Sequence, residues 1–215
     1  MDNSWVITTV KEDRYDEFIN FIYKDFFPRE SLIKTSGLDI KLDPKFHKQM
    51  ETWLRDDISL IAIDLSTEQI IGICYNYITE KHSSSPQADE SSSNETQIPD
   101  NIVSFLNYLQ EGYNIYKELG VERGMELHYL GVKEGYGGCG IARKLTEKTI
   151  ELARTKRLEF IQSTPSTGAT RHLFESLGFE TISEKKAIDY FIDGQPVFPY
   201  ASDKDISRFV VKKLC

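Results

Sequence analysis

Four closely spaced glycines mark the part of the chain with the clearest chemical potential: Gly135, Gly137, Gly138 and Gly140. The apolar residues 127–132 before them predict a buried strand, and helical spacing of apolar residues over 141–152 predicts an amphipathic helix. The first N–H groups of a helix lack intrahelical partners and carry the positive end of its dipole. Because glycines let the backbone approach phosphate oxygens closely, this pattern predicts a site for a phosphate-bearing ligand.

Three kinds of phosphate site compete for this segment. Residues 135–140 spell the dinucleotide pattern G-x-G-x-x-G, but too few residues follow for the βαβαβ unit that this pattern should open. A P-loop needs Lys-Ser or Lys-Thr after its last glycine, and neither pair occurs there. The remaining candidate is the loop that holds the pyrophosphate of an acyl-coenzyme A (acyl-CoA). A glycine-rich turn without a ligand is the structural alternative.

The segment resembles motif A of the GCN5-related N-acetyltransferases (GNAT), which reads Arg/Gln-x-x-Gly-x-Gly/Ala. Gly140 and Ala142 match it, whereas the first position is Gly137, which has no side-chain phosphate donor. Backbone amides would then carry the phosphate contacts, together with Arg143 and Lys144. The resemblance implies acetyl-CoA as co-substrate, bound by the end of the strand and by the loop: Leu130, Gly131, Val132, Gly137, Gly138, Cys139, Gly140, Ile141, Ala142, Arg143 and Lys144.

A second segment, Thr167 to Glu180, resembles motif B of the same superfamily, in which a helix ends at Leu-Gly-Phe and leads into a strand. Residues 177–179 match these three positions, and Gly178 would supply the left-handed turn that ends the helix. The family's frequent tyrosine, which can protonate the leaving thiolate, is Phe174 here. Another group or water must therefore donate that proton.

Within the superfamily, the chain is similar to the insect arylalkylamine N-acetyltransferases. That branch carries an aromatic pair followed by Asp-Glu-Pro-Leu, and residues 26–32 of this chain read FFPRESL. Glu30 aligns with the proposed general base of the branch, while Arg29 and Ser31 replace the flanking Asp and Pro. The branch also places two hydroxyls four residues apart before motif B. Ser166 and Thr170 occupy these positions, where one helical turn would place both on one face.

The chemistry of amine acetylation explains why such groups are needed. An alkylammonium has a pKa of about 10.4, so it must lose a proton before it attacks a thioester. Glu30 in a partly buried cleft could accept that proton, and a backbone N–H near residues 130–132 could meet the oxyanion. Direct transfer in a ternary complex needs no covalent enzyme intermediate and is preferred over a cysteine route.

Each of these residues also has a structural interpretation. Glu30 could cap the turn after Pro28, and Ser166 and Thr170 could cap a helix. His128 is the alternative base, because other acetyltransferases carry their base on this strand. Alternation along the strand places Glu126 and His128 on one face with Leu130, although a single strand histidine is more often structural.

Composition narrows the class of protein. The net charge of −8 argues against a general nucleic-acid binder, because phosphate contacts need clustered Lys and Arg. The first ten residues lack the features of a signal peptide, and no apolar run approaches the ~18 residues of a membrane span. Three cysteines, Cys74, Cys139 and Cys215, lack metal-ligand spacing and suit a reducing compartment. We expect a cytoplasmic protein without a metal, in which Cys139 is a tolerated small residue.

The order of predicted elements agrees with the GNAT fold: one α/β domain over residues 1–215, with a central, mostly antiparallel mixed sheet and helices on both faces. Helical spacing predicts helices over 15–26, 46–54, 102–116, 141–157 and 167–176. Apolar runs predict strands over 4–10, 59–67, 69–80, 127–132, 159–163, 181–192 and 206–214. The Ser-rich residues 81–97 predict a flexible loop.

The resemblance thus implies an N-acetyltransferase that acts on a primary amine, with an arylalkylamine as the leading substrate class. Two alternatives remain open. One is an acetyltransferase for polyamines or other aliphatic amines, and the other is a non-catalytic acyl-CoA-binding protein with this fold. The expected partners are acetyl-CoA and a small amine, and we expect a monomer or weak dimer.

Overall fold

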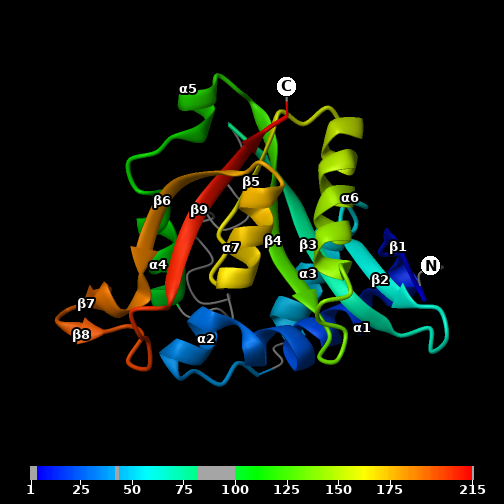
Figure 1. Cartoon of the computed structure of the whole chain (residues 1–215), viewed down its shortest axis with the longest axis horizontal. Coiled ribbons are helices and arrows are strands. Elements are labelled where there is room, and N and C mark those ends of the chain that lie inside the picture. The colour runs from blue at the N-terminus through cyan, green and yellow to red at the C-terminus, as the bar shows by residue number, and fades with distance from the viewer. Residues whose placement is uncertain (1–3, 42–43, 82–99, 215) are drawn as a thin grey trace.

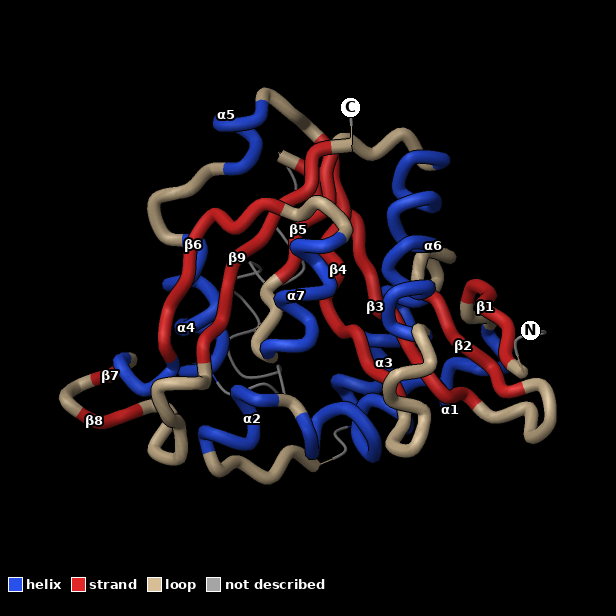
Figure 2. Tube along the Cα trace, viewed as in Figure 1, coloured by secondary structure: helices blue, strands red, loops and turns tan. Residues whose placement is uncertain are grey.

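A seven-stranded sheet forms the centre of the computed structural model, which describes residues 4–41, 44–81 and 100–214 (Figures 1 and 2). The strand order is β1-β2-β3-β4-β5-β9-β6, and every neighbouring pair is antiparallel except β4–β5. The strands are β1 (Trp5–Thr9), β2 (Leu60–Asp64), β3 (Ile70–Glu80), β4 (Arg123–Val132), β5 (Phe160–Ser163), β6 (Glu180–Lys186) and β9 (Ile206–Lys213). This arrangement confirms the predicted α/β class with a mostly antiparallel sheet. The loop predicted over residues 81–97 lies, beyond its first residue, outside the described residues.

Helices cover both faces of the sheet, as predicted (Figure 1). On one face, buried side chains of α1 (Tyr15–Phe21), α3 (Pro44–Leu54) and α4 (Asp100–Gln110) form a core with β3 and β4. On the other face, α6 (Ile141–Thr155) and α7 (Gly168–Ser176) form a second core with the same strands. The sheet therefore presents two buried surfaces, which explains the almost continuous apolar run of β3. No described helix is long and apolar enough to cross a membrane.

An irregularity in β4 changes which side chains share a face. Tyr75 of β3 pairs with Tyr129, but the next residue of β3 pairs with Leu127, so His128 is an extra residue in the ladder. Leu127 and Leu130 both pack into the α6–α7 core, whereas Tyr129 packs into the opposite core. The prediction that His128 shares a face with Leu130 is therefore wrong, because strict alternation does not continue through a bulge.

The strands β4 and β5 stay together over only three residue pairs, Gly124–Glu126 with Phe160–Gln162. Beyond them, the Ser163 hydroxyl donates to the Leu127 carbonyl at 2.7 Å, and the remaining residues of β4 are not paired with β5. The sheet therefore opens between the end of β4 and the segment that follows β5.

The turn before the opening is built from short, irregular helices rather than from the single helix predicted over 15–26. After α1 the chain makes a π-helical turn (Ile22–Phe26), a 3₁₀ turn (Phe27–Arg29) and then α2 (Ser31–Ser36). Pro28 lacks an N–H and interrupts the helical ladder at this point. The residues that follow can therefore turn back toward the sheet.

Two further predicted elements are divided. The helix predicted over 102–116 is α4 followed by α5 (Ile115–Leu119), because Gly112 adopts a φ of 78° between them. The strand predicted over 181–192 ends with β6 and continues as a 3₁₀ turn (Ala187–Asp189) and a hairpin of β7 (Phe191–Ile192) and β8 (Gln195–Pro196). Its Asp-Gly turn is a recognisable hairpin signal, with positive φ at both positions. The predicted strand at 127 begins four residues earlier, at Arg123.

Candidate active site

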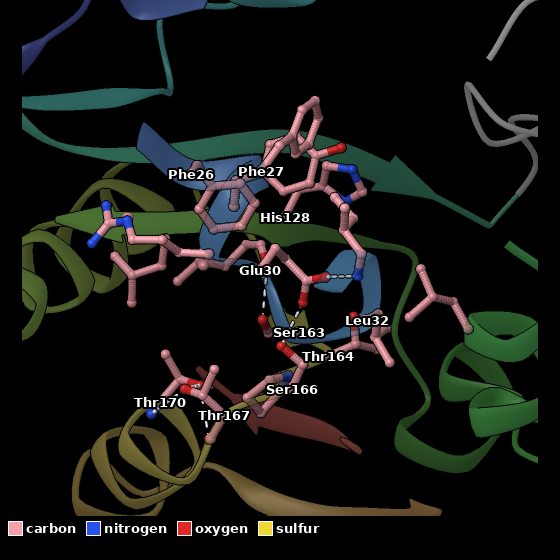
Figure 3. Close-up of a pocket in the computed structure, with 18 of the residues that line it drawn as sticks. Phe26, Phe27, Glu30, Leu32, His128, Ser163, Thr164, Ser166, Thr167 and Thr170 are labelled. Atoms are coloured by element: carbon pink, nitrogen blue, oxygen red, sulfur yellow. Dashed lines mark hydrogen bonds between the residues drawn. The ribbon is translucent and has the colours of Figure 1, made fainter. Parts of the chain in front are cut away.

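A cavity of about 220 Å³ fills the opening between β4 and the segment after β5 (Figure 3). Its walls come from the end of β4, from residues 163–170 and from the turn between α1 and α2, and α4 contributes Ile102 and Leu106. Apolar and aromatic side chains make up most of the lining. Glu30, His128, Ser166 and Thr170, the four residues predicted for catalysis, all line it. The sequence therefore selected residues that the fold brings together.

Glu30 combines a structural role with a position in this cavity. It is the N-cap of α2, where its Oε2 accepts from the Ile33 N–H at 2.9 Å. Its Oε1 accepts from the Ser166 hydroxyl at 2.6 Å, and Figure 3 shows the two side chains close together in the cavity lining. Burial raises the pKa of the Glu30 carboxyl above its usual value, although the hydrogen bonds from Ser166 and Ile33 oppose this shift. Capping and proton acceptance are therefore compatible in one side chain.

Ser166 and Thr170 are placed differently from the prediction. The N-cap of α7 is Thr167, whose hydroxyl contacts the Thr170 hydroxyl at 2.8 Å and accepts from the Thr170 N–H. Ser166 precedes the helix, so the two predicted hydroxyls do not lie on one helical turn. Thr170 is engaged within the cap, whereas Ser166 contacts Glu30 directly.

His128 belongs to a buried polar cluster beside the cavity. Its Nδ1 lies 3.2 Å from Glu126 Oε1, and Gln162 donates to Glu126 Oε2 at 2.8 Å. Burial opposes ionisation of Glu126, but hydrogen bonds led by that of His128 hold the pKa of this carboxyl below its usual value. The imidazole also packs edge-on against Tyr75 and Tyr77. These contacts fit the structural interpretation of a strand histidine.

Main-chain groups of β4 face the opening at alternate residues. The Lys133 N–H donates to the Ile71 carbonyl at 2.8 Å, so this pair is hydrogen-bonded across the β3–β4 ladder. In an antiparallel ladder the bonding alternates, so Leu130 and Val132 direct their N–H and C=O groups away from β3. Gly131, the third predicted residue, bonds to β3 instead. An oxyanion or amide in the opening could therefore meet Leu130 or Val132.

The predicted phosphate loop has an open backbone without side chains over its glycines. Gly138 and Gly140 have φ values of 76° and 78°, and a Cβ atom added at Gly137, Gly138 or Gly140 would meet nothing within 4 Å. Gly140 is the N-cap of α6, and the first helical bond runs from the Lys144 N–H to the Gly140 carbonyl. The N–H groups before Lys144 are thus available to an anion. The open space over the glycines and the unpaired N–H groups of the helix N-terminus are the features that the predicted phosphate site requires.

One loop contact was missed at the level of sequence. The Tyr136 hydroxyl donates to Asp64 Oδ2 at 3.0 Å, which fastens the glycine loop to the turn between β2 and β3. Asp64 Oδ1 also accepts from the Ser66 hydroxyl and from the N–H groups of Ser66 and Thr67. These hydrogen bonds lower the pKa of Asp64 to about 2. The sequence gives no sign of this pair, because the two residues are 72 positions apart and both residue types are ordinary in a turn.

The other predicted loop residues have mixed positions. Arg143 donates to the Ser176 hydroxyl at 2.7 Å, and Lys144 lies 3.3 Å from Glu147, so both cations have partners on α6 or α7. Cys139 is exposed in the loop. Phe174 is buried against Phe179. It therefore offers no hydroxyl for a leaving thiolate.

One group of possible metal ligands occurs in the described part of the chain: Asp16, His47 and Glu51. None of the three lines the cavity. His47 Nε2 lies 3.1 Å from Asp16 Oδ1, which is a hydrogen-bond contact between α3 and α1. The absence of a metal from the reaction stays a prediction.

Comparison with known proteins identifies the family. The profile of the acetyltransferase (GNAT) family matches residues 22–179, a range that contains the turn of Glu30, the glycine loop and α7. The chain belongs to this family. GNAT enzymes use acetyl-CoA as acyl donor, so N-acetyltransferase activity is the activity that family membership implies.

Solved structures of other GNAT proteins have the same fold. Arylalkylamine N-acetyltransferase 2 from Aedes aegypti superposes with a TM-score of 0.87 at 23% identity, over 99% of this chain and 100% of that chain. A mosquito arylalkylamine N-acetyltransferase-like protein, 5b, gives 0.86 at 19% identity, over 98% and 100%. The Drosophila melanogaster polyamine N-acetyltransferase, which forms N-acetylagmatine, gives 0.82 at 16% identity, over 98% and 100%. The predicted resemblance to the insect branch is confirmed at the level of fold.

Proposed function

We propose that this GNAT protein transfers the acetyl group of acetyl-CoA to a primary arylalkylamine, with Glu30 as general base. One observation carries the proposal: the Glu30 carboxylate lies in the cavity between the strands, 2.6 Å from the Ser166 hydroxyl, in surroundings that raise its pKa. A carboxylate with a raised pKa is a better proton acceptor. In this role the Glu30 carboxylate accepts the proton that the ammonium substrate must lose.

In the proposed reaction, the ammonium loses a proton to Glu30, directly or through a water, and the amine attacks the thioester carbonyl. The new C–N bond forms first, and a main-chain N–H of Leu130 or Val132 meets the oxyanion of the tetrahedral intermediate. The C–S bond then breaks, and the proton that the attacking nitrogen still has to lose passes through a hydroxyl or water to the leaving thiolate. Ser166 holds the Glu30 carboxylate in place.

The cavity wall favours an aromatic amine. Phe26 and Phe27 line it beside Tyr129, and these rings pack together with centroid separations of 4.9 Å for Phe26–Tyr129 and 5.6 Å for Phe27–Tyr129. Leu32, Ile102 and Leu106 extend an apolar surface that an aryl group would bury favourably. A polyamine is the alternative substrate, favoured by a second carboxylate, Asp25, in the same lining.

A thiol-release assay tests the proposal. Purified protein is mixed with acetyl-CoA and with arylalkylamines, aliphatic amines or polyamines, and free coenzyme A is measured over time. We expect turnover first with arylalkylamines and its loss in Glu30→Gln, which keeps an oxygen for the α2 cap. If the protein prefers polyamines, its substrate class is polyamines and not arylalkylamines. Tight binding of acetyl-CoA without turnover on any amine would support the non-catalytic alternative.

A further inference from the structure

The Arg29 side chain joins the turn that carries Glu30 to the end of β4. Its Nε donates to the Asp25 carbonyl at 2.6 Å, and its Nη2 donates to the Val132 carbonyl at 2.8 Å. Arg29 is exposed and lines the cavity. Both acceptors are neutral, and no ion pair joins Arg29 to a carboxylate in the part of the chain that the structure describes. Its positive charge is therefore not compensated within the described protein.

This guanidinium lies where the opening meets the glycine loop. Val132 is the last residue of β4 and pairs with Gly72 of β3. Ile141, the first residue of α6, packs so closely on Gly72 that a methyl group added there would lie 2.9 Å from Ile141 Cγ2. The N-terminus of α6 thus begins at the level of Val132. Arg29, bonded to Val132, therefore lies at the end of the opening that is next to the N-terminus of α6.

The glycine loop itself is short of available cations. Gly137 occupies the motif position where the family usually carries Arg or Gln. Arg143 is bonded to Ser176, and Lys144 is paired with Glu147, so neither is held toward the loop. Backbone N–H groups can cradle phosphate oxygens, but they carry only the partial charges of the helix dipole. Lys133, at the start of the loop, donates to Gln69 Oε1 at 3.0 Å, so a cation held toward the phosphates would have to come from another element.

We propose that Arg29 supplies this charge and binds a phosphate of acyl-CoA from the wall opposite the glycine loop. The proposal rests on the acyl-CoA function proposed above. A guanidinium has more N–H donors than the Asp25 and Val132 carbonyls occupy, and its planar fork matches phosphate oxygens. Arg29 thus replaces the side-chain donor that Gly137 lacks. It also fixes the Glu30 turn against β4 once acyl-CoA is bound.

A purely structural Arg29 would behave differently from a phosphate ligand. If Arg29 only fastens the turn to Val132, a neutral side chain that can still donate to these carbonyls should preserve binding. A lysine at position 29 would then bind coenzyme A no more tightly than a neutral side chain. If Arg29 binds phosphate, charge decides affinity, and the effect weakens with ionic strength because part of the attraction is screened by salt.

Calorimetric titration with coenzyme A separates these possibilities. We compare the wild-type chain with Arg29→Gln, which keeps N–H donors, and with Arg29→Lys, which keeps the charge. Arg154→Gln, an exposed arginine in the last turn of α6, is the control. We expect at least tenfold weaker binding in Arg29→Gln, the range for losing a hydrogen bond to a charged group. Binding should recover to within about threefold in Arg29→Lys and stay unchanged in Arg154→Gln.

Two further measurements complete the test. The ratio of wild-type to Arg29→Gln affinity should fall when ionic strength is raised. Repeating the titration with dephospho-coenzyme A assigns Arg29 to the pyrophosphate if the loss persists and to the ribose phosphate if it vanishes. Wild-type affinity in a folded Arg29→Gln, or a loss that lysine does not restore and salt does not change, would overturn the proposal. Failure of the wild-type chain to bind coenzyme A would instead refute the proposed function.

Discussion

The Ser166 hydroxyl donates to the Glu30 carboxylate at 2.6 Å across 136 residues of sequence. This contact joins the turn before α2 to the segment between β5 and α7, so it spans the cavity where the sheet opens. It stabilises the ionised form of a carboxyl group whose burial favours the neutral form. The balance between these two effects sets the pH at which Glu30 can accept a proton.

Glu30→Ala should lower kcat at least about 10²-fold, the usual range for losing a general base. Affinity for acetyl-CoA should change little, since the proposed phosphate contacts come from the glycine loop and Arg29 and not from the Glu30 carboxylate. His128→Ala is the matched comparison, because His128 lines the same cavity. Steady-state kinetics of both variants decide between the two bases. If Glu30→Ala turns over normally and His128→Ala is inactive, the base is His128 on β4.

Ser166→Ala should move the acidic limb of the kcat/KM–pH profile to higher pH. Activity requires the ionised carboxylate, so it rises as pH passes the pKa of Glu30, which already lies above its usual value. Without the Ser166 hydroxyl, the ionised form loses a hydrogen bond and that pKa rises further. Thr170→Ala, which removes a hydroxyl of the same wall that bonds within the α7 cap, should leave the limb in place. If the acidic limb does not move in Ser166→Ala, the limb does not report the pKa of Glu30.

Gly140→Val should weaken acetyl-CoA binding at least tenfold, or about 1.4 kcal/mol, because a branched side chain would fill the phosphate cradle. The substitution also strains the backbone, since Gly140 has a φ of 78°. Gly112→Val is the control for strain: Gly112 has the same φ and equally open surroundings, but lies between α4 and α5. Calorimetry and thermal melting of both variants separate strain from lost binding. Equal affinity in Gly140→Val and the wild-type chain would contradict the phosphate site.

Asp64→Asn should lower the melting temperature at neutral pH but have less effect in acid. The pKa of Asp64 is lowered to about 2 in the folded chain, against about 4 for an unperturbed Asp, so its ionised form is stabilising above the unfolded value. That contribution is lost as pH falls from about 4 toward about 2. The gap between the melting curves of wild type and variant should therefore narrow over this range. A constant gap would show that ionisation of Asp64 does not matter.

Local patterns predicted most of the fold and the members of the site. Glycine spacing located the loop before α6 that is the candidate phosphate site, and the motif around Glu30 located the base candidate in the cavity. Contacts between distant segments were not predictable in this way: Tyr136 with Asp64, and Arg29 with Val132, join ordinary residue types that only the fold brings together. A missing donor at Gly137 was visible in the sequence, but its replacement was not.

Boundaries failed where a single residue overrides periodicity. The helix predicted over 102–116 is broken at Gly112, and the strand predicted over 181–192 is ended by tertiary context, with a hairpin at Asp193-Gly194 beyond it. Ser166 and Thr170 were predicted to share one helical turn because hydroxyls four residues apart suit such a turn. Thr167 takes the cap instead, since its side chain bonds the Thr170 N–H.

The extra residue at His128 divides β4 into two halves of opposite phase. If the pairing of the first half continued with His128 opposite Tyr75, Gly131 would take the ladder position that Val132 holds opposite Gly72. The amides turned toward the opening would then belong to Tyr129 and Gly131 rather than to Leu130 and Val132. The bulge thus selects which main-chain groups of β4 face the opening. The position of a bulge can define a reaction surface without contributing a side chain to it.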